Sequence, residues 1–154
     1  AGSRIHTLLL LDERSFCAQP TLAVGTSDGC VRLWRAYDQP HSVHLLTAWQ
    51  ASAVPGIVAA SSADGCGPAP RDTTVASLAW QPSRALMAAA GGPGVEVNMW
   101  DVRAEQLTTR LSLPAGSSCC ITSLAADSST PIILAGGSDG ILRALDPRAP
   151  PTDC

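Results

Sequence analysis

Short apolar runs, separated by small polar clusters, recur along the whole of the 154-residue chain. Each run is short, bounded by Gly, Pro, Asp or Ser, and too brief for an amphipathic helix, so the pattern predicts β-strands. The predicted strands cover residues 5–11, 22–25, 30–35, 43–50, 75–80, 86–90, 95–102, 107–113, 123–125, 132–135 and 141–146. The sequence therefore predicts an all-β fold.

Two ten-residue stretches of this pattern resemble each other, Gly25–Trp34 and 136–145. Extending the pairing back to Pro20 gives six identities in fifteen positions at a constant offset of 111 residues. A weaker copy spans 91–100, so that Trp100 follows Trp34 by 66 residues and Leu145 follows Trp100 by 45. A period of roughly 40–45 residues with a Ser-Asp-Gly turn and a strand ending in Trp-Asp is typical of a four-stranded β-propeller blade.

The repeat divides the chain into about three blades. We assign 1–50 to the first blade with its outer strand, 74–113 to the second, and 114–154 to a truncated third. Residues 51–73 are rich in Ala, Ser, Gly and Pro and are expected to form a flexible insertion loop. The outer strand 43–50 is expected at the edge of the following blade.

An incomplete ring follows from this division, because propellers close with typically 4–8 blades. We therefore expect the chain to be a piece of a larger protein. With the end faces of its blades uncovered, it should show weak or no cooperative unfolding alone.

The repeated turn and strand-end residues are assigned to structure. Asp and Gly are suited to the positive φ angles of primed hairpin turns, and an Asp side chain can accept hydrogen bonds from its own turn. The positions assigned in this way are Asp28, Gly29, Trp34, Trp100, Asp101, Asp139 and Gly140.

Three further residues are candidates for contacts with a protein partner: Arg32, Trp49 and Arg143. Loops and side chains at the rims of a rigid scaffold are the usual place for binding. The structural alternative is that the Arg stems cover blade edges and that Trp49 belongs to the packing.

Composition and charge exclude several classes of function. The net charge of −3, with no basic run, gives no footprint for nucleic acid, and the apolar run Leu8–Leu11 is too short to span a bilayer. The six Cys residues form no Cys-x-x-Cys pair and fit buried thiols in a reducing compartment, the cytoplasm. The chain has three His and no metal-ligand spacing. Its two Gly-x-Ser-x-Gly stretches, 25–29 and 136–140, are followed by predicted strands and not by helices, so neither Ser stands in a nucleophile elbow, and we expect no catalytic residue, cofactor or metal.

The order of these features resembles the C-terminal WD-repeat domain of the Raptor family, the regulatory-associated proteins of the TOR kinase. The resemblance lies in Asp28–Trp34, Thr47–Gln50, Cys120–Leu124 and the pair Asp139 and Gly140. In WD repeats generally, the turn Asp joins a network with the strand Trp and a His before the first strand. This chain has no Gly-His dipeptide, so that network is expected to be partial.

The resemblance implies a non-enzymatic scaffold subunit of the first TOR complex, which presents substrates to the kinase in nutrient-responsive growth control. It implies a cytoplasmic location with recruitment to the lysosomal or vacuolar surface. Substrate-motif docking in that family is attributed mainly to regions N-terminal to the propeller, so no docking residue is carried over. The alternatives are a WD-repeat substrate receptor or assembly scaffold in ubiquitination or trafficking, and an accessory propeller of an enzyme.

Overall fold

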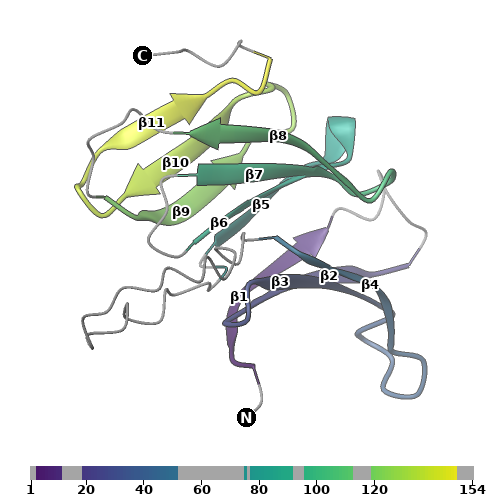
Figure 1. Ribbon diagram of the computed structural model, residues 1–154. Coiled ribbons are helices and arrows are strands. Elements are labelled where there is room, and N and C mark those ends of the chain that lie inside the picture. Colours follow the sequence, from purple (N-terminus) through teal and green to yellow (C-terminus); the bar gives the residue numbers. More distant parts are fainter. Residues whose placement is uncertain are drawn as a thin grey trace, which may run out of the picture.

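The chain forms three antiparallel β-sheets that follow one another in sequence (Figure 1). The computed structural model describes residues 3–11, 19–51, 75, 77–91, 96–112 and 119–148. The predicted insertion 51–73 lies outside these residues, apart from Ala51. The described sheets have four, four and three strands and do not close into a ring, which confirms the predicted all-β, open-propeller class.

The first sheet contains β1 (Ile5–Leu11), β2 (Thr21–Thr26), β3 (Cys30–Arg35) and β4 (His44–Gln50) in chain order. Along β3 the side chains alternate as predicted, since Val31 and Leu33 are completely buried while Arg32 and Trp34 point to the opposite face and are half-buried.

The second sheet contains β5 (Ser77–Gln81), β6 (Leu86–Ala90), β7 (Glu96–Asp101) and β8 (Gln106–Ser112), also in chain order. A single 3-10 turn, Pro82–Arg84, joins its first two strands. Small side chains dominate β6, so the neighbouring sheets can approach it closely on both faces.

The third sheet contains β9 (Ile121–Ala126), β10 (Ile133–Gly137) and β11 (Leu142–Leu145), with β10 in the middle. Among the described residues, β11 pairs only with β10, so its other edge carries no strand.

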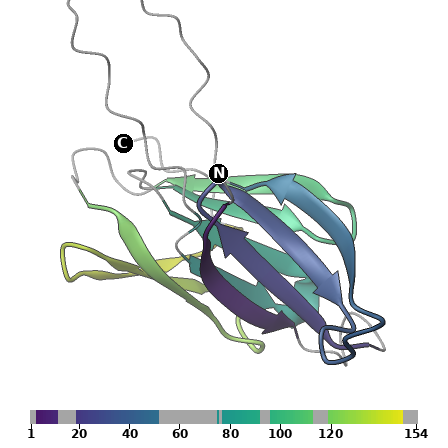
Figure 2. The ribbon, with the colours of Figure 1, turned by 90° about the horizontal axis from the view of Figure 1, so that it is seen from below.

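Two apolar cores hold the sheets together, one at each junction, and Figure 2 shows the same succession of sheets from below. The first core joins the inward faces of the first and second sheets through residues such as Leu33 and Met87, which are 1% and 0% exposed. The second joins the other face of the second sheet to the third through residues such as Met99 and Ile133, both 0% exposed. The second sheet is thus covered on both faces.

The outer faces of the first and third sheets are open in this structure. Leu8 and Leu10 on β1 are 60% and 62% exposed, and Leu142 on β11 is 68% exposed. Within the described part of the chain, only the second sheet packs against the first. The apolar side chains on this face of β1 therefore form an exposed hydrophobic surface.

The predicted position of the outer strand was wrong. Residues His44–Gln50 do not join the edge of the following blade, because β4 pairs antiparallel with β3 of its own sheet, with Val31 opposite Trp49. The short connection after β3 favours this result, because consecutive antiparallel strands joined by a short loop pair with each other.

Candidate interaction surface

The Ser-Asp-Gly turns of the first and third sheets have the same geometry. Each is a three-residue hairpin loop in which the Gly amide donates to the carbonyl three residues earlier, from Gly29 to Thr26 and from Gly140 to Gly137, both at 3.1 Å. Gly29 and Gly140 have φ angles of 79° and 76°, so a residue without Cβ suits these positions.

The expectation of a primed turn was wrong for these loops. Among the described residues, the non-Gly residues with positive φ do not include Asp28 or Asp139, so only the Gly of each turn is left-handed. A three-residue hairpin loop that ends on a left-handed residue needs one such position, whereas a two-residue primed turn needs a positive φ at its first central residue as well.

Each turn Asp forms an ion pair with the Arg four residues later. Arg32 Nη2 lies 2.8 Å from Asp28 Oδ2, and Arg143 Nη2 lies 2.6 Å from Asp139 Oδ2. Each carboxylate also accepts the backbone N–H two residues on, at 3.1 Å in both turns. The side-chain partners of these Asp residues thus include an Arg in both turns, Thr26 in the first turn and Cys119 in that of the third sheet, in place of the Trp and His of the WD network.

These contacts lower the pKa of both carboxyl groups. The hydrogen bond from Arg32 is the main cause for Asp28, followed by that from the Thr26 hydroxyl, and both hold its pKa well below the usual range. For Asp139 the main cause is the hydrogen bond from Arg143, followed by the backbone N–H of Ile141. The same pairs raise the pKa of each Arg, so both turns remain ionised at neutral pH.

The ion pairs bear on the two Arg residues predicted as partner contacts. The side chains of Arg32 and Arg143 are 27% and 18% exposed and are directed to their own turns. They stiffen the hairpins, and part of each guanidinium remains at the surface. Their role in partner binding stays a prediction.

The second blade lacks both members of this pair. Asn98 on β7 stands at the position of Arg32 and Arg143, 66 residues after the first and 45 before the second, while Gly94 replaces the turn Asp. Gly94 itself lies outside the described residues. Asn98 is 8% exposed, and its Nδ2 donates to the Ala51 carbonyl at 2.7 Å, which links the second sheet to the end of β4. We did not single out Asn98, although its place in the repeat would have marked it.

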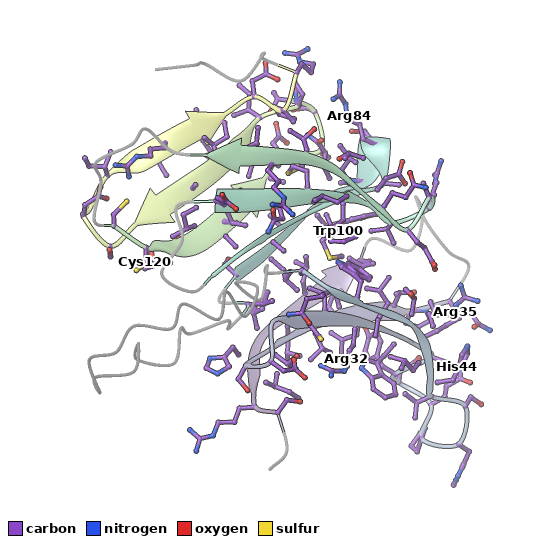
Figure 3. All side chains as sticks on the ribbon, viewed as in Figure 1. Arg32, Arg35, His44, Arg84, Trp100 and Cys120 are labelled. Atoms are coloured by element: carbon purple, nitrogen blue, oxygen red, sulfur yellow. The ribbon has the colours of Figure 1, made fainter. Side chains whose placement is uncertain are left out.

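Trp49 lies at the junction of the first two sheets. Its ring centroid is 5.7 Å from that of Trp100, and the two planes are tilted by 41°. Figure 3 shows Trp100 between the second and the first sheet. Trp49 packs against the first core and lines a small cleft with Trp100, Asp101, Val102 and Glu105. Whether it also meets a partner stays a prediction.

Asp101 serves the turn that follows β7. Its Oδ1 accepts the backbone N–H groups of Arg103 and Ala104 at 2.8 and 3.0 Å. Asp146, 45 residues later, likewise accepts the Arg148 N–H at 2.9 Å. The Arg148 side chain also binds it and, as the main cause, lowers the pKa of Asp146 to about 2.

A hollow of about 500 Å³ opens between the inner strands β1, β5 and β9. Apolar side chains such as Leu10, Trp80 and Leu124 line it, and Asp127 and Ser128 lie at its rim. Hydrogen bonds from the hydroxyl and backbone N–H of Ser129 lower the pKa of Asp127, so this carboxyl group is held as an anion by its own turn.

The described residues contain no group of three or more His, Cys, Asp and Glu placed to hold a metal ion. No helix in this part of the chain is long and apolar enough to cross a membrane.

No family model matches the chain, but it is similar to several curated proteins, three of which follow. It is 34% identical over 130 residues to Regulatory-associated protein of TOR 1 of Arabidopsis thaliana, covering 84% of this chain and 9% of that protein. It is 29% identical over 153 residues to Target of rapamycin complex 1 subunit KOG1 of Saccharomyces cerevisiae, covering 99% and 9%. It is 33% identical over 154 residues to Target of rapamycin complex 1 subunit mip1 of Schizosaccharomyces pombe, covering 99% and 10%.

Solved structures agree with the fold. The crystal structure of Chaetomium thermophilum Raptor is 27% identical with a TM-score of 0.72, over 99% of this chain and 12% of that one. Saccharomyces cerevisiae Sqt1, at 16% identity and a TM-score of 0.73 over 96% of this chain and 34% of that one, shares the fold alone. The chain spans about a tenth of the length of the curated relatives that it matches.

Proposed function

We propose that this chain, a homologue of one segment of the Raptor, KOG1 and mip1 proteins, is part of a non-enzymatic scaffold subunit of the first TOR complex. The observation that carries the proposal is the match of 99% of this chain to KOG1 and mip1, two proteins named as subunits of target of rapamycin complex 1. The likeness to the Raptor crystal structure over 99% of the chain supports it.

The proposed role is to present substrates to the TOR kinase in nutrient-responsive growth signalling. The described residues support a rigid module, because the charged turn residues form ion pairs within their own blades. The proposed partners are therefore the TOR kinase and its substrates or regulators, and not a nucleic acid or a small-molecule cofactor. We place this assembly in the cytoplasm, with recruitment to the lysosomal or vacuolar surface.

Affinity purification of the tagged protein that contains this chain, from its own cells, tests the proposal. Mass spectrometry should recover a TOR kinase in near-equal amount. Recovery of a cullin-type ligase or of coat proteins, with no TOR kinase, would overturn the TOR assignment and favour a substrate receptor in ubiquitination or a scaffold in trafficking.

The matched control is the same protein with an Asp28→Arg and Arg32→Asp exchange. This exchange keeps the two charges of the turn but moves the carboxylate away from the backbone N–H of Cys30. If the turn only stiffens the blade, kinase recovery should persist, whereas a loss of kinase with the blade still folded would place a contact at this turn.

A further inference from the structure

The connection between β9 and β10 contains a threonine that is followed by a proline. Thr130 and Pro131 form the one place in the 154 residues where a Ser or Thr directly precedes a Pro. Kinases of the proline-directed class select this dipeptide, and the proline disfavours helical backbone at the residue before it. Thr130 lies outside any helix or strand. The sequence therefore offers one acceptor hydroxyl for a kinase of this class.

The side chain of Thr130 is accessible to an enzyme. Residues 127–130 are all exposed and lie beyond the ends of the two strands that they connect, at the rim of the third sheet. The sheets pack against one another through their faces and not through such turns. Turns at the rim of a rigid scaffold are the usual place for sites that another protein recognises.

The backbone of Thr130 has a separate structural role. Its carbonyl accepts a hydrogen bond from Gln81 Nε2 at 2.6 Å, across the junction between the second and third sheets. Gln81 is 0% exposed, and its Oε1 has no hydrogen-bond partner among the described residues. A shift of the turn would leave the whole amide buried without a partner, which is more costly than the loss of an exposed hydrogen bond.

The hydroxyl of Thr130 lies beside a negative charge. The Asp127 carboxylate accepts hydrogen bonds from the hydroxyl and the backbone N–H of Ser129, which lower its pKa, and the Thr130 hydroxyl adds to this effect. Within the described part of the chain, no salt bridge joins an Arg to Asp127. A phosphate on Thr130, with a charge of about −1.5 to −2, would therefore meet an ionised carboxylate that no Arg neutralises.

We propose that Thr130 is a phosphorylation site for a proline-directed protein kinase, and that its phosphate releases the β9–β10 turn from the second sheet. Thr130 Oγ1 forms a bond to the γ-phosphorus of ATP, the bond from that phosphorus to the bridging oxygen of the departing ADP breaks, and the hydroxyl proton passes to the catalytic carboxylate of the kinase. The phosphate then repels Asp127, and Gln81 loses its acceptor. The proposal does not depend on the TOR assignment.

Phosphorylation in vitro tests the site. The substrate is the tagged protein that contains this chain, purified from its own cells and first freed of phosphate with a phosphatase that is then removed. A recombinant mitogen-activated protein kinase with ATP and Mg²⁺ is the probe, and mass spectrometry of the peptides locates the phosphate. We expect phosphate on Thr130 and its loss in the variant Pro131→Ala. No phosphate on Thr130, or an equal amount in Pro131→Ala, would overturn the proposed site.

Hydrogen exchange followed by mass spectrometry tests the release of the turn. Phosphorylation should speed the exchange of amides in 127–131 and in β5 by about tenfold, as expected when a buried hydrogen bond is lost. In Asp127→Asn the repelling charge is absent, so phosphorylation should speed exchange less, relative to the same variant without phosphate. Unchanged exchange after phosphorylation, or an equal acceleration in Asp127→Asn, would overturn the proposed release. Absence of a TOR kinase from the purification described above would leave both parts standing.

Discussion

At the scale of single residues, a carboxylate and a guanidinium account for the repeated turn. The Ser-Asp-Gly sequence predicted a hairpin, and the structure adds that Arg32 and Arg143 bind the turn Asp residues by two hydrogen bonds each. The identity of the Arg in both copies was visible in the sequence, but its partner was not. Whether an Arg four residues after the Asp reaches it depends on how the strand leaves the turn, and the sequence does not show this geometry.

The lowered pKa of Asp139 predicts how stability depends on pH. Because the folded state binds its proton less readily than the unfolded state, the stabilisation is present above the ordinary Asp pKa of about 4 and is lost as the pH falls below it. Because the open ring is expected to unfold over a broad range, the midpoint is taken as the urea concentration at half of the spectroscopic change. Asp139→Asn should lower this midpoint at neutral pH and flatten its decline between about pH 5 and pH 3. The control is Glu96→Gln on the exposed start of β7, which should leave that decline unchanged.

The buried hydrogen bond of Asn98 predicts how much a substitution in the second blade lowers the free energy of unfolding. Asn98→Ala removes the donor to the Ala51 carbonyl in a buried setting, so it should lower the free energy of unfolding by about 1–3 kcal/mol. Thr122→Ala removes an exposed hydroxyl bond to Gly136 and should change it by no more than about 0.5 kcal/mol. Urea denaturation followed by tryptophan fluorescence measures both, and equal effects would contradict a special role for Asn98.

At the scale of elements, the spacing of the repeat predicted the strands well and their neighbours less well. The strands β2, β3 and β10 lie within about two residues of the predicted ranges. The partner of β4 was missed, because an alternating pattern shows which face of a strand is apolar but not which sheet that strand joins. The left-handed backbone of Ala85 and Glu105 also had no sequence signal, since neither is a Gly.

Gly25 on β2 marks a close approach of β2 to β1 and to the start of the second blade. A Cβ at this position would lie 2.5 Å from Thr7 Cγ2 and 2.8 Å from Val75 Cγ1, so β1 and the start of the second blade would have to shift. Gly25→Ala should therefore lower the free energy of unfolding by about 1–3 kcal/mol.

The comparison for this variant is Gly140→Asn. A Cβ at Gly140 meets nothing within 4 Å, and Asn tolerates the left-handed backbone there, so the loss should stay below about 1 kcal/mol. Thermal unfolding of the two variants side by side gives the ranking. A larger loss for Gly140→Asn would contradict the steric reading of Gly25.

At the scale of the whole molecule, the open outer faces of the first and third sheets should bind hydrophobic molecules. Leu10 and Leu142 are 62% and 68% exposed on opposite end sheets, so the chain should bind a hydrophobic dye such as ANS. The double variant Leu10→Thr and Leu142→Thr should bind less dye while its unfolding midpoint stays close to that of the parent. Ile133→Thr, at a position that is 0% exposed, should instead increase dye binding by loosening the second core. Unchanged dye binding in the double variant would contradict this assignment.

The position of the second sheet between two cores has a consequence for the order in which the molecule opens. Stacked repeats hold one another through nearest-neighbour contacts, so the unit with two neighbours opens last and the units with one neighbour fray first. In deuterated buffer the amides of β6 should exchange more slowly than those of β1 and β11. In a limited digestion of these 154 residues on their own, a protease that samples such openings would then cut the first and third blades first, and the second blade would be the last part to persist.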